Sequence, residues 1–314
     1  MKALVISSSK NIFKVNLLEG GKAGEPLECR IKGKILKGVE GFYNPLAPGD
    51  IVEIDEEKGL VLELLERKNM FSRFNQKGQK PQLLASNVDL VLCVCSVDSP
   101  PFRPRFLDRA LLQAEAMEIP SVIVCNKYDL CENMDIDIEE RLSDFERLGY
   151  PVFRISVKNN IGLDSLKDFI SGKFSLLMGQ SGVGKSSLVN FLIPTLLLKT
   201  REVSDKFNRG RHTTTQPVLY EVPGIQCGTR IIDTPGIRRF VPYGIESEEI
   251  IYYMKEFAPL AGKCSFGLSC SHESERGCKI MEAVSAGVIH EDRYESFLRI
   301  REELSGKKEY PDND

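Results

Sequence analysis

Residues 174–186 read Phe-Ser-Leu-Leu-Met-Gly-Gln-Ser-Gly-Val-Gly-Lys-Ser, and this stretch decides the fold of the central part of the chain. The apolar residues before Gly179 predict a buried strand, and the apolar pattern after Ser186 predicts a helix. A Gly-x-x-x-x-Gly-Lys-Ser pattern between strand and helix is typical of a phosphate-binding loop, whose backbone N–H groups surround phosphate oxygens. We expect Lys185 to reach the β- and γ-phosphates and the Ser186 hydroxyl to bind Mg²⁺. The residues expected to hold the phosphates are Gly179, Gln180, Ser181, Gly182, Val183, Gly184, Lys185, Ser186 and Ser187.

The base of the nucleotide is indicated by Asn126-Lys127-Tyr128-Asp129, which follows another predicted strand. The Asp129 carboxylate can accept hydrogen bonds from N1–H and the exocyclic amine of guanine, whereas adenine offers no such pair of donors. Asn126 can bridge the base to the phosphate loop, and the Lys127 stem can lie over the ring. Ser156-Val157-Lys158, also at a strand end, matches an accessory contact to the base. The tetrapeptide alone is weak evidence, but together with the phosphate loop it predicts GTP.

A third motif, Asp233-Thr-Pro-Gly236, follows the predicted strand at residues 229–232. We expect Asp233 to hold Mg²⁺ through water and the Gly236 N–H to bond the γ-phosphate. The polar segment 197–215 lacks apolar periodicity. This is typical of the switch loops of GTPases, which become ordered when they contact the γ-phosphate and Mg²⁺. One of Thr213, Thr214 and Thr215 is expected to close on Mg²⁺, and position favours Thr214 or Thr215.

The residue that orients the attacking water is not evident from these motifs. Many GTPases carry a Gln after the Asp-x-x-Gly motif, and here Ile237 occupies that place. His212 is the catalytic candidate; alternatively, it contacts phosphate, loop backbone or RNA. We therefore expect slow intrinsic hydrolysis that a partner completes.

The motifs occur in an inverted order, because an ordinary GTPase carries its phosphate loop before its base-reading motif. Apolar strands alternate with helical patterns over residues 84–240, which predicts a parallel sheet with helices on both faces. The central part is thus expected to be an α/β P-loop GTPase domain of circularly permuted topology. In this order the switch segments 197–215 and 233–240 lie just ahead of the C-terminal part.

The flanking regions have different patterns. Residues 2–8, 12–19, 27–34 and 50–57 read as short β segments, which suggests a closed barrel of the OB type. Residues 74–82 read as a polar linker. After residue 245 the pattern is mainly helical, over 245–257 and 290–304, with a Cys/His segment between.

That segment contains Cys264, Cys270, His272 and Cys278. Three thiolates and an imidazole predict a closed structural Zn²⁺ site. The alternatives are disulfides or unrelated thiols. The other cysteines, at 29, 93, 95, 125, 131 and 227, are expected in the core or as bystanders.

Composition narrows the class of protein. The chain has 314 residues, 42% hydrophobic and 28% charged, which is typical of a globular protein. It has no secretory signal pattern and no apolar run of transmembrane length, so we expect a cytoplasmic protein without a membrane partner. A net charge of −3 gives no hint of nucleic acid. Local basic clusters occur at residues 30–37 and 67–80, and each alone is best interpreted as a solvated face.

The motifs together closely resemble one family over nearly the whole chain, the ribosome small-subunit-dependent GTPase A family (RsgA, YjeQ/YloQ type). The resemblance rests on the barrel, on Asn126–Asp129 before the phosphate loop, on Gly210–Thr215, and on the Asp233 and Cys/His motifs. Smaller matches are residues 86–89, 107–111 and 293–294. The spacing from Cys264 to Cys270 is one residue longer than is usual in the family, and we expect a loop to absorb it.

The resemblance implies GTP hydrolysis stimulated by the 30S subunit, a role in its late maturation, and contacts to 16S rRNA through the barrel and zinc domain. It implies Mg²⁺ with GTP and one structural Zn²⁺. We expect a barrel over residues 1–75, a permuted GTPase domain over 84–242 and a zinc-binding helical domain over 243–314, in a monomer. Two alternatives remain: a GTPase with another RNA or protein client, and a nucleotide-gated RNA-binding module with little turnover.

Overall fold

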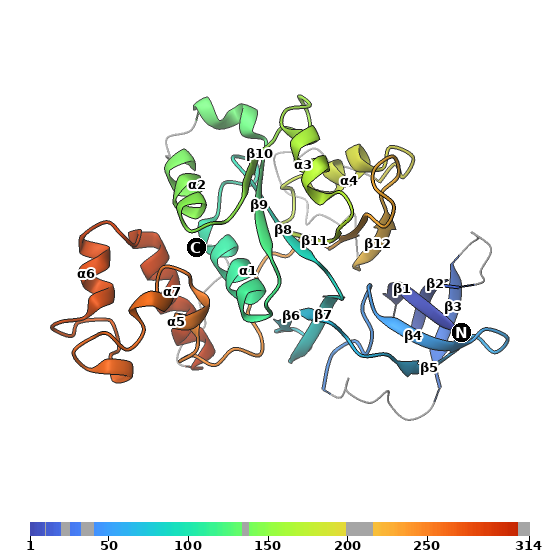
Figure 1. Cartoon of the computed structure of the whole chain (residues 1–314), viewed down its shortest axis with the longest axis horizontal. Helices are drawn as coiled ribbons and strands as arrows, with labels where there is room; N and C mark the ends of the chain where they lie inside the picture. The colour runs from blue at the N-terminus through green and yellow to red at the C-terminus, as the bar shows by residue number, and fades with distance from the viewer. Residues whose placement is uncertain (10, 20–25, 33–40, 134–137, 199–215, 307–314) are drawn as a thin grey trace.

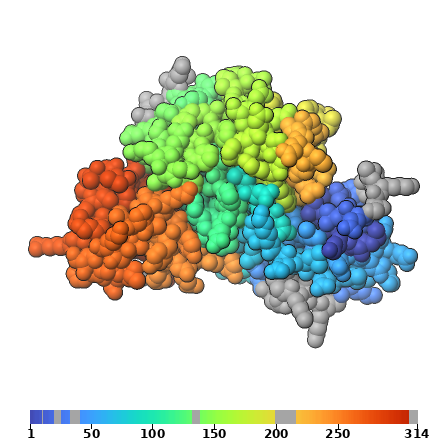
Figure 2. All heavy atoms as spheres, viewed as in Figure 1, coloured from blue at the N-terminus to red at the C-terminus, as the bar shows by residue number. Residues whose placement is uncertain are grey.

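The structure is a computed structural model of residues 1–314, and it describes all of them except 10, 20–25, 33–40, 134–137, 199–215 and 307–314. A β-barrel lies at one end, a sheet with helices on both faces lies in the middle, and the helical C-terminal part lies at the other end (Figure 1). The space-filling view shows the same order, from blue at the barrel through green to red at the C-terminal part (Figure 2). None of the described helices is both long and apolar enough to cross a membrane.

The N-terminal barrel contains β1 (Lys2–Ser9), β2 (Ile12–Leu17), β3 (Leu27–Ile31), β4 (Ile51–Asp55) and β5 (Leu60–Leu64). Its strand order is β1-β2-β3-β5-β4, and β4 pairs with β1 to close the ring. β3 and β5 are parallel, and the other neighbours within the barrel are antiparallel. Inward side chains alternate with outward ones, and Phe13, Val15, Val52 and Ile54 fill the interior. The predicted OB-type barrel is therefore confirmed.

The prediction of a polar linker at residues 74–82 is wrong. This segment belongs to a β-hairpin of β6 (Met70–Asn75) and β7 (Lys80–Ser86). Its turn is closed by the Asn75 side chain, whose Oδ1 accepts the Gly78 N–H at 3.2 Å. The hairpin is also bonded to a residue distant in the sequence, because the Phe74 N–H donates to the Val241 carbonyl at 2.9 Å. Polar residues at an exposed turn resemble a linker, and the distant partner is not visible locally.

The central sheet has the strand order β10-β9-β8-β11-β13-β12. Its strands are β8 (Leu90–Ser96), β9 (Ser121–Asn126), β10 (Val152–Arg154), β11 (Phe174–Gly179), β12 (Val218–Glu221) and β13 (Arg230–Asp233). All neighbours are parallel except β12 and β13. Every residue of β8, β9 and β11 is buried, as a doubly covered parallel sheet requires.

Helices cover both faces of this sheet (Figure 1). Along β8, Val91 and Cys93 share a core with α1 (Pro104–Ala116) and α2 (Ile138–Arg147). Leu90 and Leu92 point the other way, toward α3 (Leu163–Ile170) and α4 (Lys185–Leu192). The alternation of a strand thus separates the two helical layers.

The barrel and the central sheet are joined edge to edge. Ser7 of β1 pairs antiparallel with Val218 of β12. β12 is the first described strand after the predicted switch segment 197–215, so the barrel is bonded to the strand that follows this segment.

The C-terminal part contains α5 (Ile250–Tyr253), η2 (Ala258–Leu260), η3 (Gly267–Ser269), α6 (Lys279–Ser285) and α7 (Glu291–Leu304). The helix expected over 245–257 is reduced to four residues in α5. The backbone is extended at Met254, and this bend lets Met254 and Phe257 enter the core of the C-terminal part.

A buried ion network attaches this part to the central sheet. Arg293 of α7 donates to Asp108 of α1 at 2.6 Å and to Glu256 at 2.5 Å. Its side chain is only 3% exposed, and the two carboxylates are buried as well. Loss of the arginine would leave two buried carboxylates without their shared cation.

We therefore expect Arg293→Ala to lower the free energy of unfolding by ~3–5 kcal/mol. Urea denaturation followed by circular dichroism measures this loss. Lys279→Ala is the control, because Lys279 pairs with Glu282 at the surface, where an ion pair contributes little, and its removal should change stability far less. Equal effects of the two substitutions would contradict the role given to Arg293.

Candidate functional site

The nucleotide motifs meet at one edge of the central sheet. The phosphate loop begins at the end of β11, and the accessory segment follows β10. The base-reading tetrapeptide begins at the last residue of β9, and the Asp233 motif begins at the last residue of β13. Since these strands are parallel, their carboxyl ends lie at the same edge, where open α/β sheets bind ligands. The inverted order along the chain therefore converges on a single site.

The phosphate loop turns tightly between β11 and α4. Gly182 and Gly184 have φ angles of +87° and +97°, which favour glycine. A Cβ atom at Gly184 would lie 2.1 Å from Asn126 Nδ2, so the loop also needs glycine for close approach to the base-reading segment.

Lys185 is the first residue of α4, and its side chain folds back into the loop. Its Nζ donates to the Gly179 carbonyl at 2.8 Å and to the Gln180 carbonyl at 2.9 Å. An ammonium has three N–H groups, so a third can donate to a phosphate oxygen. Burial lowers the pKa of Lys185 to about 8, although nearby Asp233 acts in the opposite direction.

Asn126 connects the loops of the site. Its Nδ2 donates to the Val183 carbonyl at 2.8 Å, and its Oδ1 accepts the Val157 N–H at 3.2 Å. One buried amide thus holds the phosphate loop and the accessory segment in a fixed relation.

Asp129 lies in the short 3₁₀ helix η1 (Tyr128–Asn133) that follows β9. Its Oδ1 is buried and accepts no hydrogen bond within the described part of the chain. A buried acceptor of this kind is costly unless a donor arrives. Guanine N1–H and its exocyclic amine are such donors, so this carboxylate fits guanine.

The remaining residues of the base-reading segments have distinct surroundings. The Lys127 ammonium donates to the Ser99 carbonyl in the loop after β8, and burial lowers the pKa of Lys127. Ser156 is buried, and its Oγ accepts the Asn159 N–H at 3.2 Å. Lys158 is exposed. The contact with Ser99 was not expected from the sequence, since no motif marks that loop.

The Asp233 motif lies against the phosphate loop. Asp233 is buried, and the Thr234 hydroxyl donates to the Leu177 carbonyl at 2.6 Å. A Cβ atom at Gly236 would lie 2.5 Å from Ser181 Cα, so only glycine fits there. Ile237 is buried in the core of the sheet, and its N–H donates to the Gly179 carbonyl. An apolar side chain in the core cannot orient water.

The segment after Gly236 is held by both neighbouring parts of the molecule. The Arg239 guanidinium donates to Glu303 of α7, and Arg109 of α1 donates to the same carboxylate. The Arg239 carbonyl accepts a hydrogen bond from Arg73 of β6 at 3.2 Å. The loop expected to sense the γ-phosphate is thus linked to the C-terminal helix and to the hairpin.

His212, Thr213, Thr214 and Thr215 lie outside the described residues. Their roles stay predictions.

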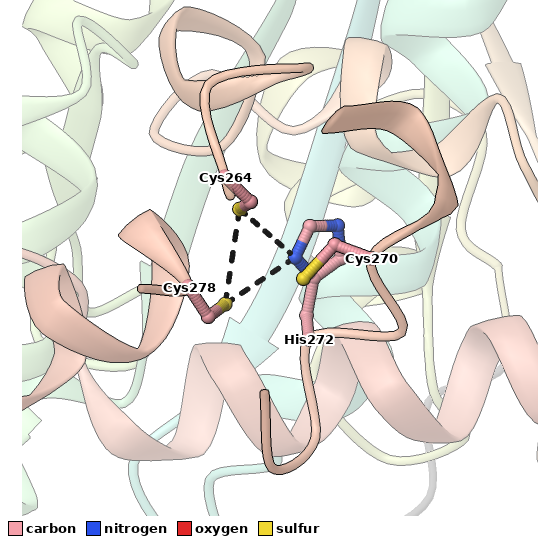
Figure 3. A group of neighbouring side chains, drawn as sticks. All are labelled: Cys264, Cys270, His272 and Cys278. Carbon is pink, nitrogen blue, oxygen red and sulfur yellow. Dashed lines mark hydrogen bonds between the residues drawn. The ribbon is translucent and has the colours of Figure 1, made fainter. Parts of the chain in front are cut away.

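Cys264, Cys270, His272 and Cys278 come together in the C-terminal part (Figure 3). All four are buried, and one ligand atom from each lies within 4.8 Å of every other. Cys264 Sγ and Cys278 Sγ are 3.9 Å apart, and they lie 3.6 and 3.5 Å from His272 Nδ1. A tetrahedral site with Zn–S bonds of about 2.3 Å has edges of about 3.8 Å, so these separations fit zinc.

The surroundings of the cluster support a metal rather than disulfides. All three cysteines are free thiols. Backbone N–H groups of Lys279 and Met281 donate to Cys264 Sγ and Cys278 Sγ, as outer partners of metal-bound thiolates do. Between Cys264 and Cys270 the chain makes the single turn of η3.

Comparisons with known proteins agree with this architecture. Residues 64–241 match the family model of the RsgA GTPase. The "Small ribosomal subunit biogenesis GTPase RsgA" of Phocaeicola vulgatus is 38% identical over 309 residues, covering 96% of this chain and 97% of that protein. The protein of the same name from Flavobacterium johnsoniae is 39% identical over 296 residues, covering 91% and 89%.

Two solved structures are similar over nearly the full length. YjeQ from Thermotoga maritima has a TM-score of 0.69 at 32% identity, covering 98% of this chain and 99% of that one. YloQ, described as a circularly permuted GTPase, has a TM-score of 0.65 at 27% identity, covering 99% and 96%. The chain therefore belongs to the RsgA GTPase family.

Proposed function

We propose that this chain hydrolyses GTP to GDP and phosphate when stimulated by the small (30S) ribosomal subunit, and that it acts late in maturation of that subunit. The observation that carries the proposal is the single sheet edge where a phosphate loop meets a carboxylate with a buried, unused acceptor atom. Full-length relatives named as small ribosomal subunit biogenesis GTPases support the client.

Each predicted residue has a role in this proposal. Asp129 reads the two donors of guanine, Asn126 and Val157 connect the base to the phosphate loop, and Lys185 binds the β- and γ-phosphates. The other contacts come from the loop backbone and from the flanking side chains: Lys127, Tyr128, Ser156, Lys158, Gly179, Gln180, Ser181, Gly182, Val183, Gly184, Ser186, Ser187, Asp233 and Gly236.

Two metals belong to the proposal. Ser186, Asp233 and one of Thr213, Thr214 and Thr215 hold Mg²⁺ with GTP, which neutralises charge on the phosphates. Cys264, Cys270, His272 and Cys278 hold one Zn²⁺. A site with four protein ligands has no open position, so this zinc stabilises the fold and does not enter the reaction.

Hydrolysis then depends on positioning more than on covalent chemistry. Lys185 and the loop N–H groups stabilise charge that develops on the transferred phosphoryl group. Because Ile237 is buried, we assign the role of orienting the attacking water to His212. The 30S subunit would complete the catalytic site around this water.

We expect His212→Ala to reduce GTP turnover at saturating small subunits by about 10²-fold, the usual contribution of a residue that orients or activates water. Steady-state phosphate release measures it. His290→Ala is the matched control, because His290 only caps α7 by accepting the Asp292 N–H. Normal turnover by fully stimulated His212→Ala would refute the assignment.

The partners follow from the same proposal. The barrel and the zinc-containing part contact 16S rRNA; exposed Lys14 and Arg30 on β2 and β3 support a contact through the barrel. The second basic cluster contributes less, since Arg67 pairs with Asp50 and Lys68 with Asp89. The described parts of the nucleotide site, on β9, β10, β11 and β13, all come from one chain, which supports a monomer. The expected compartment is the cytoplasm.

Cosedimentation with ribosomal subunits tests the client. The full chain, loaded with a non-hydrolysable GTP analogue, should sediment with 30S and not with 50S particles, and GDP should release it. Binding to another RNA or protein in preference to 30S would favour the alternative client. Binding without any turnover would favour a nucleotide-gated module.

A further inference from the structure

Two side chains outside the known motifs, Glu139 and Arg154, form a network with Tyr128 beside the guanine-reading turn. The Tyr128 hydroxyl donates to the carboxylate of Glu139, in the first turn of α2. Arg154 donates to the same carboxylate through Nε at 3.0 Å and Nη2 at 2.5 Å. A tyrosine of the base-reading tetrapeptide is thereby connected to the end of β10.

The geometry of α2 makes this network possible. Glu139 and Glu146 are seven residues apart, which places them on one face of the helix, two turns apart. Arg154 is the last residue of β10, and it bonds Glu146 as well, at 2.7 and 3.1 Å. Its guanidinium is fixed by four hydrogen bonds to two carboxylates, an arrangement that suits the planar fork of arginine. The hydrogen bonds from Arg154 also lower the pKa of Glu139, which keeps this acceptor ionised.

The network acts on both segments that face the base. Arg154 lies two residues before Ser156, and Tyr128 directly precedes Asp129. The Tyr128 N–H donates to the Ile155 carbonyl at 3.0 Å, so the backbone of the turn is held from the same strand end. Tyr128 is thus fixed at its backbone by Ile155, directly after β10, and at its hydroxyl by Glu139. The direction of the Asp129 carboxylate depends on this turn.

We propose that Arg154 is a positioning residue for guanine recognition, which acts through Glu139 and Tyr128 to aim both oxygens of Asp129 at the base. The inference rests on the proposed guanine site and deepens it. Arg154 and Glu139 are 24% and 47% exposed, so the ion pair itself contributes little to stability. We expect the pair to affect discrimination between bases instead. A small misplacement of the Asp129 carboxylate would weaken its hydrogen bonds to guanine.

Binding of GDP and of IDP to the full chain distinguishes this role from a structural one. Inosine lacks the exocyclic amine, so the ratio of the two dissociation constants measures how well the second oxygen of Asp129 is aimed. We expect Arg154→Ala to weaken GDP binding about 5- to 20-fold and IDP binding less, so that the ratio falls at least about 3-fold. Tyr128→Phe, which removes only the hydroxyl, should shift the ratio in the same direction. Arg154→Lys should restore it only in part, because an ammonium cannot bridge both carboxylates in the plane.

Arg147→Ala is the matched control, since Arg147 is an α2 arginine that is 67% exposed and pairs with Asp144. It should leave both dissociation constants unchanged. A wild-type preference for GDP that survives intact in Arg154→Ala and Tyr128→Phe would overturn the inference alone. A wild-type chain without preference for GDP over IDP would overturn the guanine site and the inference together.

Discussion

Asp129→Asn is expected to weaken GDP binding by about 10²–10³-fold and to create a preference for xanthosine diphosphate. The Asp129 carboxylate offers two acceptors, and its Oδ1 is buried without a partner in the described structure. The substitution replaces one acceptor by an amide N–H₂ that faces a guanine donor, so a hydrogen bond is lost and a buried donor is left unpaired. Xanthine carries a carbonyl in place of the exocyclic amine, and this carbonyl can accept from the new amide.

Titration with GDP, XDP and ADP measures the change. Asp164→Asn is the control, because Asp164 is an exposed residue of α3 and belongs to neither base-reading segment. Unchanged GDP binding by Asp129→Asn would exclude this carboxylate as the guanine reader. Binding of ADP as tightly as GDP by the wild-type chain would exclude guanine selectivity altogether.

Removal of the metal is expected to unfold the C-terminal part. Binding of a structural Zn²⁺ contributes an apparent free energy of about 10–16 kcal/mol to folding. A small helical unit that loses this contribution is not stable. The four ligands here span residues 264–278, between α5 and α6, and no long regular element within that span could replace the metal. We therefore expect the fold of this segment to depend on a metal bound by these four ligands.

Cys278→Ser should reduce bound zinc from one ion per chain to below about 0.1, and hydrogen exchange should show loss of protection in α6. Elemental analysis and exchange mass spectrometry measure the two effects. Cys227→Ser is the control, since Cys227 is an exposed cysteine in the turn between β12 and β13. A Cys278→Ser chain that keeps its stability and its protection would show that the cluster is not structural.

The sequence was most informative where a motif and its flanking elements are local. The phosphate loop is marked by Gly182, Gly184 and Lys185 within a few residues, and the structure has the expected strand and helix on either side. The parallel sheet and the barrel could be predicted because apolar periodicity records which faces are buried. The close approach of the four Cys/His ligands was also expected, since they are spaced over fifteen residues, 264–278.

Features that depend on distant partners could not be predicted. Residues 74–82 of the hairpin Met70–Ser86 look like a linker in the sequence, because the hydrogen bond from Phe74 to Val241 joins residues far apart in the chain. The basic cluster at 67–80 looked like one surface, yet Arg67 and Lys68 are paired with Asp50 and Asp89. Arg154 carried no motif at all, although the seven-residue spacing of Glu139 and Glu146 was a visible signal of a shared helix face.

The structure also gives a physical reason for two short matches to the family. Residues 107–111 contain Asp108 and residues 293–294 contain Arg293, and these two side chains form the buried ion pair between α1 and α7. The C-terminal helix is thus fixed to the central sheet, and Glu303 of the same helix binds Arg239 after the Asp233 motif. The permuted order places this contact directly downstream of the residues expected to sense the γ-phosphate.

GTP turnover by the purified full chain, with and without 30S subunits, tests the central claim most directly. Lys185→Ala serves as the control for contaminating activity, because it removes the lysine expected to bind the phosphates. We predict slow turnover by the chain alone, a large stimulation by 30S but not by 50S subunits, and no stimulated turnover by Lys185→Ala. A rate that 30S subunits leave unchanged, or equal rates for wild type and Lys185→Ala, would contradict the claim.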